Sequence, residues 1–559
     1  MKGYKFNKLF VAMLLSATVA VPAYAGQSML TTPKGGVFVM PTGASRFAVS
    51  ASPSDPQEIR TRIPIGDKRL ADLKFQSEVL GFKNDKIEVV EVPLKDNSVA
   101  AQESRALSNG FIPQFVTATC TTNSATGYAP SDIHGAAGPS RLVVVTNVDI
   151  GVYDKSSCLT ISNVSLKSLF GAFKIPDTEA LFDPRVLYDN SVGRFFVTAE
   201  STVTGNTDQY QYFAVSQDST ATAWWIYRIP LSVGPAFFCK KAANSFWDYP
   251  QSGKSSRRWF ITANDFPVNE LGAQEAQIGV GPTGAVLAID KWPTLTGQPA
   301  RAVCFYDRAF NTAAPIVLDS STQSVFLAPT PTRILRSNYT EGANIGLDKF
   351  VAATPYAIIP WQTPPNAVQP NGEMLDSLDG RFQSASIQTD DQLWNIHTVN
   401  YNGRPLIRWY RLQNSVSKVL STVTFASTAT SHLFNPSIVT SPLPKGRNGE
   451  PAFITASRTD PTVSCAGIEC NGNNGMASMI TFSGPNDNSS FWTQSLAGVS
   501  TDQFTLCNTD PRGSCRWGDY SSITVDPNDA HSAWGFNQLI SGPSVFNWTT
   551  LAAKETNIP

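Results

Sequence analysis

The sequence is poor in charge and has no long apolar run beyond its N-terminus. Charged residues make up 16% of the 559 residues, and the formal net charge is −1. A near-neutral surface excludes the basic footprint of a nucleic-acid-binding protein or of a protein held on an anionic membrane. No stretch after the N-terminal region reaches about 18 uninterrupted apolar residues. We therefore expect a soluble mature chain with no membrane span.

Familiar catalytic signatures are missing as well. No G-x-S-x-G elbow, H-E-x-x-H motif, Walker loop or dinucleotide fingerprint occurs in a fitting context. Only four histidines are present. His134 and His397 fall on expected strands, where a packed, hydrogen-bonded histidine is commoner than a general acid or base. The sequence alone therefore names no reaction.

The first 25 residues have the three parts of a removable signal peptide. Lys2, Lys5 and Lys8 form a positive segment, and an apolar run follows from Leu9 to Val21. Ala23 and Ala25 then supply the small residues that a signal peptidase reads. An apolar run of about 13 residues is too short to span a bilayer comfortably. We expect cleavage after Ala25 and a secreted or periplasmic protein.

Eight cysteines in an exported chain indicate disulfides. Two pairs are close enough in sequence to close small loops, Cys465 with Cys470 and Cys507 with Cys515. The remaining four would form two longer bridges whose pairing stays open: Cys120, Cys158, Cys239 and Cys304. A metal site is the alternative, but no C-x-x-C occurs and the histidines lie far from the cysteines in sequence.

Residues 183–200 read as a strand, a polar turn around Asn190 to Gly193, and a second strand with an aromatic pair. Variants recur every 50–70 residues from about Asp132 onward, each with three or four short strands separated by Gly, Asn, Asp and Pro. This pattern predicts an all-β fold, a β-propeller of seven blades, with six or eight as alternatives because the fourth copy is irregular. Tandem β-sandwiches are disfavoured because each needs about 100 residues.

Three segments follow from this interpretation. Residues 1–25 are the signal peptide, residues 26–115 an N-terminal extension or small β-rich domain, and residues 116–559 the propeller. A strand from before Asp132 is expected to complete the last blade, because this removes an exposed sheet edge.

Several phrases occur in an order that resembles a group of secreted bacterial β-propeller proteins, mostly hypothetical exported proteins. These phrases are Asp183-Pro with Arg194-Phe-Phe, Trp247-Asp-Tyr-Pro, Asp379-Gly-Arg with Leu393-Trp, and Arg516-Trp-Gly-Asp-Tyr-Ser-Ser. The resemblance covers about residues 130 to 540. It implies the propeller fold and export, and it implies no reaction.

An acidic residue opens the innermost strand of most copies, where it would face the axial channel. These residues are Asp132, Asp183, Asp248, Asp379 and Asp519, with Asn435 in the sixth copy. Such a ring could bind Ca²⁺, which takes six to eight oxygen ligands. Alternatively, each Asp accepts backbone N–H groups from a neighbouring loop as a structural brace, which is the interpretation that we favour for most of them.

Arginines lie near several of these acids, at positions 185, 194, 381 and 516. An arginine cluster over a propeller channel could hold an acidic sugar, as in sialidases, which use a Tyr nucleophile and a carboxylate. If the protein is an enzyme, the candidate catalytic residues are Asp248, Tyr249, Arg381, Asp519 and Tyr520. The sialidase Asp-box pattern is not matched, however, so pairing of these arginines with the aspartates is the preferred interpretation.

Two functional hypotheses follow. The first is an exported propeller that binds a glycan, a peptide or a surface partner without catalysis. The alternative is a carbohydrate-active hydrolase or lyase at the mouth of the channel, which would need two carboxylates about 5–10 Å apart beside Arg or Tyr. Bound Ca²⁺ is the one cofactor that the sequence suggests.

Overall fold

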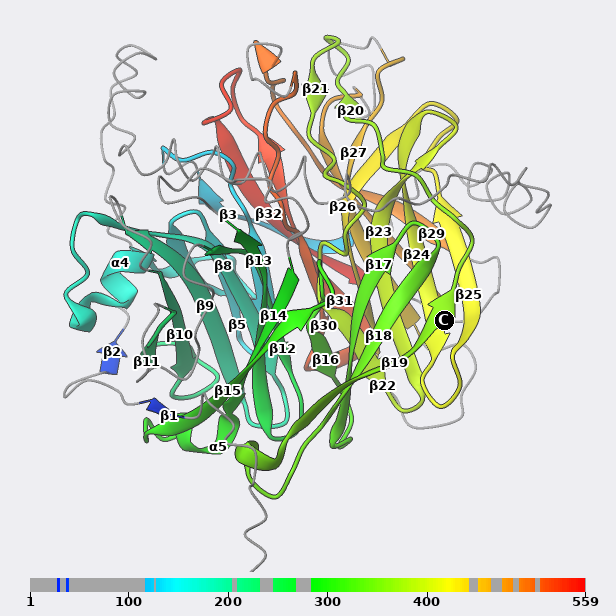
Figure 1. The fold of residues 1–559 in the computed structure, drawn as a ribbon. Helices are drawn as coiled ribbons and strands as arrows, with labels where there is room; N and C mark the ends of the chain where they lie inside the picture. The colour runs from blue at the N-terminus through cyan, green and yellow to red at the C-terminus, as the bar shows by residue number, and fades with distance from the viewer. Residues whose placement is uncertain are drawn as a thin grey trace, which may run out of the picture.

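The fold is all-β and is built from short antiparallel sheets (Figure 1). The computed structural model describes residues 28–30, 37–39, 116–124, 127–203, 209–231, 245–267, 283–441, 451–463, 475–485, 492–507 and 513–557. The predicted signal peptide lies outside these residues. Among the helices of the described part, none is long and apolar enough to cross a membrane.

The first three blades are four-stranded and follow one another in sequence order. Blade 1 consists of β4 (His134–Ala137), β5 (Arg141–Thr146), β6 (Asp149–Asp154) and β7 (Thr160–Ser165). Blade 2 consists of β8 (Glu179–Asp189), β9 (Arg194–Val203), β10 (Tyr210–Ser216) and β11 (Ala223–Pro230). Blade 3 consists of β12 (Ser245–Lys254), β13 (Arg258–Pro267), β14 (Thr283–Asp290) and β15 (Ala300–Arg308).

Blade 4 is the irregular copy that the sequence indicated. Its inner strand β16 (Pro315–Val317) is short, and the inner segment touches the next strand through a single bridge from Ala313 to Leu327. The outer strands are β17 (Gln323–Thr330), β18 (Arg333–Thr340) and β19 (Lys349–Ala357). Blade 5 consists of β22 (Ser386–Thr389), β23 (Gln392–Tyr401), β24 (Arg404–Gln413) and β25 (Lys418–Phe425).

The last two blades complete the circle. Blade 6 consists of β26 (His432–Thr440), β27 (Pro451–Thr459), β28 (Ser478–Pro485) and β29 (Thr493–Val499). Blade 7 consists of β30 (Ser522–Asp526), β31 (Asp529–Ile540), β32 (Trp548–Thr556) and β3 (Val116–Ser124). Because β3 precedes blade 1 in sequence, the N-terminal strand closes the last blade beside β32, as expected (Figure 1).

The seven inner strands form a closed ring. Each contacts the inner strand of the next blade, in the order β4, β8, β12, β16, β22, β26, β30, and β30 returns to β4. A ring of antiparallel sheets joined in this way is a β-propeller. The structure therefore confirms the predicted fold class, with seven blades in the part of the chain that is described.

Apolar side chains fill the seams between the blades. At the seam of blades 2 and 3, Phe196 stacks on Trp259 with ring centroids 4.7 Å apart. At the seam of blades 7 and 1, a Cβ on Gly135 would lie 2.2 Å from the ring of Phe536. This seam therefore requires glycine, since Gly135 lets a whole aromatic ring pack against the backbone.

The described pieces of the N-terminal extension add strands to blade edges. β1 (Ser28–Leu30) pairs with β15, and β2 (Val37–Val39) pairs with β11. The strand that the sequence predicts at Lys86–Val92 lies outside the described residues. Helical structure in the described part is limited to short segments: α4 (Leu166–Leu169), η2 (Gly171–Phe173), α5 (Lys291–Thr294) and η3 (Ile345–Leu347). One further hairpin, β20 (Ala367–Val368) with β21 (Met374–Leu375), precedes blade 5.

Disulfides are present, as predicted. Cys507 pairs with Cys515, and Cys120 pairs with Cys158, which settles one pairing that the sequence left open. The Cys120–Cys158 disulfide joins the closing strand β3 to the turn before β7, so it links blade 7 to blade 1. Cys304 is also disulfide-bonded, whereas the predicted Cys465–Cys470 pair and Cys239 lie outside the described residues.

Candidate functional site

A β-bulge interrupts the inner strand of blades 2, 3 and 6. The bulge residues are Asp183-Pro184, Tyr249-Pro250 and Asn435-Pro436. The residue before each proline has a positive φ, of 48° at Asp183, 60° at Tyr249 and 50° at Asn435. The structural equivalent of Asp183 in blade 3 is therefore Tyr249. This corrects the expected alignment of the copies, because Asp248 lies one residue earlier.

Three of the five ring aspartates, Asp132, Asp379 and Asp519, accept hydrogen bonds from neighbouring segments. Asp132 accepts hydrogen bonds from the Asn147 amide and from the backbone N–H of Asp519, the latter at 2.9 Å, so it links blade 1 to blade 7. Asp379 accepts two bonds from the Arg381 guanidinium, at 2.8 and 2.6 Å. These carboxylates act as braces within the loops at the channel mouth.

The arginines are engaged in the same way. Arg516 donates to Asp519 at 2.7 Å. Arg194 donates to the carbonyls of Val192 and Gly193 in its own turn. Together with the Arg381–Asp379 pair, these contacts engage Arg194, Arg381 and Arg516 with carboxylates or carbonyls of their own loops, in line with the preferred interpretation.

Two tyrosines from distant blades meet in the channel. The rings of Tyr249 and Tyr520 lie 5.1 Å apart, and both residues are buried with Leu378. The Tyr520 hydroxyl donates to Asp183 at 2.5 Å, and the Tyr249 hydroxyl donates to the Asp519 carbonyl at 3.3 Å. We refer to Tyr249, Tyr520 and Leu378 as the axial plug.

Two guanidinium groups stack on the axial plug. Arg185 lies 3.2 Å from the Tyr520 ring centroid, and Arg381 lies 4.2 Å from that of Tyr249. Burial raises the pKa of both phenols, and the Asp183 charge raises that of Tyr520 further. Both tyrosines therefore stay protonated at neutral pH, so neither is prepared as a phenolate nucleophile.

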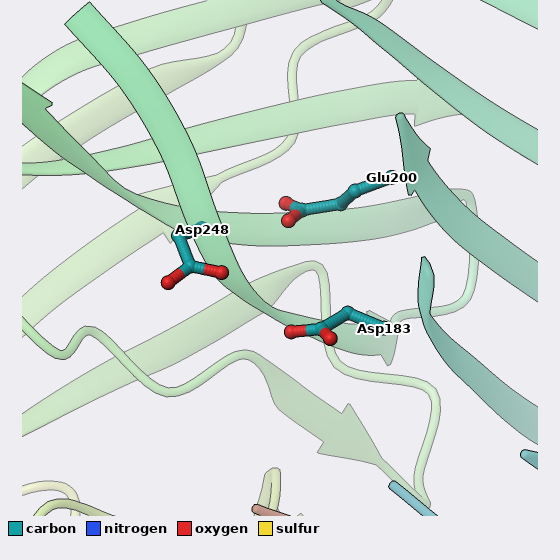
Figure 2. A group of neighbouring side chains, drawn as sticks. All are labelled: Asp183, Glu200 and Asp248. Carbon is teal, nitrogen blue, oxygen red and sulfur yellow. The ribbon is translucent and has the colours of Figure 1, made fainter. Parts of the chain in front are cut away.

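An acidic cluster lies beside the plug, where blades 2 and 3 meet. Asp183 on β8, Glu200 on β9 and Asp248 on β12 have carboxylate oxygens within 4.8 Å of one another. Figure 2 shows the three side chains turned toward a common space. Their exposed fractions are only 0%, 1% and 3%, respectively. Among the described residues, no other group of three potential metal-ligating side chains is this close.

The fold brings this cluster together through pairing and through the bulges. Glu200 lies opposite Phe182 in the β8–β9 ladder, directly before the bulge that holds Asp183. Arg185, two residues further on, donates to the Pro250 carbonyl at 2.7 Å and so joins blade 2 to the bulge beside Asp248. Asp183 and Asp248 were expected at the channel. Glu200 was missed, although a carboxylate ending an apolar strand was a usable signal.

The described histidines of the channel region are neutral and structural. His134 accepts from the Val186 N–H at 3.4 Å, and burial and the Arg185 charge lower its pKa. His397 contacts the Gly380 carbonyl and the Tyr410 hydroxyl, and burial lowers its pKa to about 3. Neither can serve as a proton donor near neutral pH.

The acidic cluster can act chemically in two ways. Carboxylates are hard oxygen donors of the kind that Ca²⁺ binds. Asp183, Glu200 and Asp248 supply such donors together, whereas Asp132, Asp379 and Asp519 are braces and are not part of this group. Paired carboxylates are also the acid and the nucleophile or base of glycoside hydrolysis.

Comparison with known proteins gives distant similarity of fold. No protein-family model and no curated protein sequence matches the chain. The α-L-arabinofuranosidase Arb93A of Fusarium graminearum is similar with a TM-score of 0.37 and 9% identity, over 79% of this chain and 98% of that one. Trypanosoma rangeli sialidase in complex with sialic acid has a TM-score of 0.35 and 10% identity, over 72% and 56%. An endo-arabinase of Bacteroides thetaiotaomicron has a TM-score of 0.24 and 11% identity, over 58% and 95%.

Proposed function

We propose that this protein is a carbohydrate-active hydrolase whose reaction centre is the acidic cluster of Asp183, Glu200 and Asp248. The observation that carries the proposal is the convergence of three carboxylates from two blades at the channel, within 4.8 Å. Glycoside hydrolysis needs two carboxyl groups on either side of the scissile bond. The axial plug would form the floor under the substrate.

The roles follow from the contacts. Asp183 is held by the Tyr520 hydroxyl, which fixes its orientation. Glu200 and Asp248, from different blades, form the pair that faces it (Figure 2). Carboxylate oxygens of the two residues lie within 4.8 Å of each other, which is closer than the roughly 6.5–9.5 Å between the carboxyl groups of inverting glycosidases and fits the retaining class. We therefore expect retention of anomeric configuration.

A second candidate function is glycan binding without hydrolysis. Burial favours it: the three carboxylates are at most 3% exposed, and the axial plug fills the channel beside them. In that case the cluster is a structural centre, with Ca²⁺ as the cation that the sequence suggests. Peptide or surface partners, which the sequence also allowed, have no specific observation in their favour.

Export is part of the proposal. The N-terminal pattern of lysines, an apolar run and Ala25 predicts a signal peptide. Disulfides such as Cys120–Cys158 persist in oxidising compartments. Together with the resemblance to exported bacterial propellers, these features support a secreted or periplasmic location.

The test is a panel of polysaccharides and chromogenic glycosides, scored for binding and for product release, with and without EDTA. Glu200→Gln and Asp248→Asn should each lower hydrolysis by about 10²-fold or more. The exposed Asp177→Asn on the loop before β8 should leave it unchanged. Binding with no product in the wild type would select the second function. Hydrolysis that survives both substitutions would exclude the cluster as the reaction centre.

A further inference from the structure

Trp292 is an exposed aromatic on an otherwise tightly held segment. It lies in α5, the one-turn helix between the third and fourth strands of blade 3, and 58% of its surface is exposed. Its neighbours Lys291 and Thr294 are completely buried. Asp248 pairs with Asn264 on β13, at the end of blade 3 that is opposite α5. Trp292 is therefore separate from the acidic cluster.

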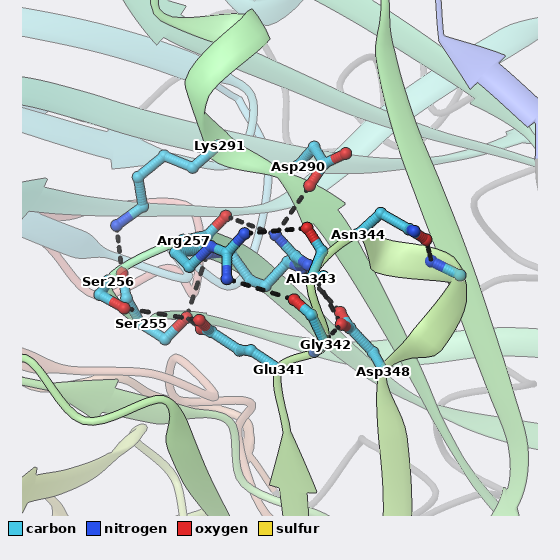
Figure 3. Close-up of polar contacts among 12 residues, drawn as sticks. Ser255, Ser256, Arg257, Asp290, Lys291, Glu341, Gly342, Ala343, Asn344 and Asp348 are labelled. Atoms are coloured by element: carbon cyan, nitrogen blue, oxygen red, sulfur yellow. Dashed lines mark hydrogen bonds and ion pairs between the residues drawn. The ribbon is translucent and has the colours of Figure 1, made fainter.

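The helix is clamped from inside the propeller. Lys291 donates to Asp189 of blade 2 at 2.6 Å. It also donates to the Ser255 carbonyl (Figure 3). Thr294 accepts from the Trp259 indole N–H at 3.0 Å. Because buried contacts fix the residues on both sides, the Trp292 backbone loses little further freedom when its ring binds a ligand.

The loop that follows α5 is docked on the outer strand of blade 2. The Tyr227 hydroxyl donates to the Gln298 carbonyl at 3.0 Å. Gly297 has a φ of 67°, and a Cβ there would lie 2.3 Å from the Trp225 ring. Only glycine allows this close approach, which sets Thr296 and Gln298 on the surface beside Trp292.

The segment of residues 292–300 is aromatic and uncharged, and it is flanked by the charged residues Asp290 and Arg301. Residues 292–300 contain no Asp, Glu, Lys or Arg, and Thr296 and Gln298 are exposed. An indole face packs on apolar C–H surfaces, and hydroxyl and amide groups exchange hydrogen bonds with sugar hydroxyls. The charges of the flanking Asp290 and Arg301 offset each other, so they do not form the cluster of basic residues that an anionic lipid headgroup or an acidic polymer needs.

We propose that Trp292, with Thr296 and Gln298, forms a binding surface for a neutral polysaccharide, separate from the acidic cluster. This surface binds the polymer and does not change the reaction at the acidic cluster. The choice of a glycan as ligand rests on the proposed function, whereas the location rests on the exposed and clamped indole.

The experiment is a pull-down with insoluble cellulose, xylan, mannan and starch granules, and with polygalacturonate gel as an acidic comparison. The wild type should be retained on at least one neutral polymer, and Trp292→Ala should weaken that retention about tenfold or more. Trp292→Phe should restore most of it. Leu347→Ala on η3, where Leu347 is also 58% exposed, is the matched control and should bind as the wild type does.

The outcomes separate this surface from the proposed hydrolase. Trp292→Ala should retain the wild-type rate on a small chromogenic glycoside, whereas Glu200→Gln should lose the rate and keep the retention. Retention that depends on Trp292 without any hydrolysis would overturn the hydrolase and support the surface. Failure of the wild type to bind any neutral polymer, or equal retention of Trp292→Ala, would overturn the surface. A change of oligomeric state in Trp292→Ala, measured by sedimentation, would overturn it as well by assigning the face to a second copy of the chain.

Discussion

Glu555 should make the seam between blades 6 and 7 sensitive to pH. It lies on β32, between β31 and the closing strand β3, and is completely buried. Its carboxyl accepts hydrogen bonds from Thr481 at 2.7 Å and from Ser483 at 3.1 Å, both on β28 of blade 6. Burial raises the pKa of Glu555 from 4.5 to about 7, against the opposing effect of these two hydroxyls.

The sign of the effect follows from the two states of the protein. Below pH 4.5 the carboxyl is protonated in both the folded and the unfolded chain. Between pH 4.5 and about 7 it ionises only in the unfolded chain, so the free energy of unfolding falls as pH rises. The total loss, reached well above pH 7, is about 3.5 kcal/mol, since one pKa unit corresponds to about 1.4 kcal/mol.

Glu555→Gln removes this ionisation and keeps an acceptor oxygen for one of the two hydroxyls, while its amide NH2 donates to the other, which rotates to accept. The variant should match the wild type at pH 4 and exceed its free energy of unfolding by up to about 3 kcal/mol at pH 8. Urea denaturation followed by tryptophan fluorescence between pH 4 and 9 measures the difference. Other titrating groups cancel, because both proteins contain them. Asp177→Asn, at an exposed position, is the control. A variant-minus-wild-type difference that does not change with pH would refute the reasoning.

Two further predictions concern the joints between blades. Asp189→Asn should destabilise the protein by about 3–5 kcal/mol, because the buried Lys254 and Lys291 lose their common partner. This loss should shrink above pH 9 in urea titrations, since burial lowers the pKa of Lys291 to about 8 and a neutral lysine needs no counter-charge; an equal loss at pH 7 and pH 10 would contradict it. Replacing Cys120 and Cys158 by serine should cost roughly 4 kcal/mol for a sequence separation of 38, against roughly 2.5 kcal/mol for Cys507 and Cys515 with a separation of 8. In thermal melts, the melting temperature should fall further for the Cys120/Cys158 double variant than for the Cys507/Cys515 double variant. The reverse order would show that the entropy of the unfolded chain does not determine the two losses of stability.

The fold was predictable because local signals repeat along the chain. The polar turn at Asn190–Gly193 lies between β8 and β9, as expected, and Asp189 accepts from the Ser191 N–H at 3.0 Å to hold it. Seven copies of such strand-turn-strand units can bury their faces only against one another. The closing role of β3 followed from the same reasoning, since an unpaired outer strand would leave an open edge.

The contacts between blades were not predictable in the same way. Asp189 meets Lys254 and Lys291, which lie 65 and 102 residues away in sequence. Nothing local to either lysine indicates burial, because lysine is ordinarily an exposed residue. Only the ring of inner strands places them beside one carboxylate. The exposure of Trp292 was not predictable either. It depends on the buried contacts of Lys291 and Thr294 that hold α5 in place, and the amino-acid composition does not indicate these contacts.

The candidate site was partly predicted, and its one register error is informative. Alignment by residue type made Asp248 the equivalent of Asp183 in blade 3. The position of the bulge shows that the equivalent residue is Tyr249. Aspartate and asparagine tolerate the left-handed conformation, but Tyr249 adopts it at a cost of roughly 1–2 kcal/mol. That cost is offset by contacts on the axis, where its ring meets Tyr520 and Arg381. Because the bulge turns Tyr249 into the plug, Asp248 is left one residue earlier to join Glu200. The tyrosine at the bulge of blade 3 therefore leaves Asp248 to complete the acidic cluster that Asp183 and Glu200 of blade 2 begin.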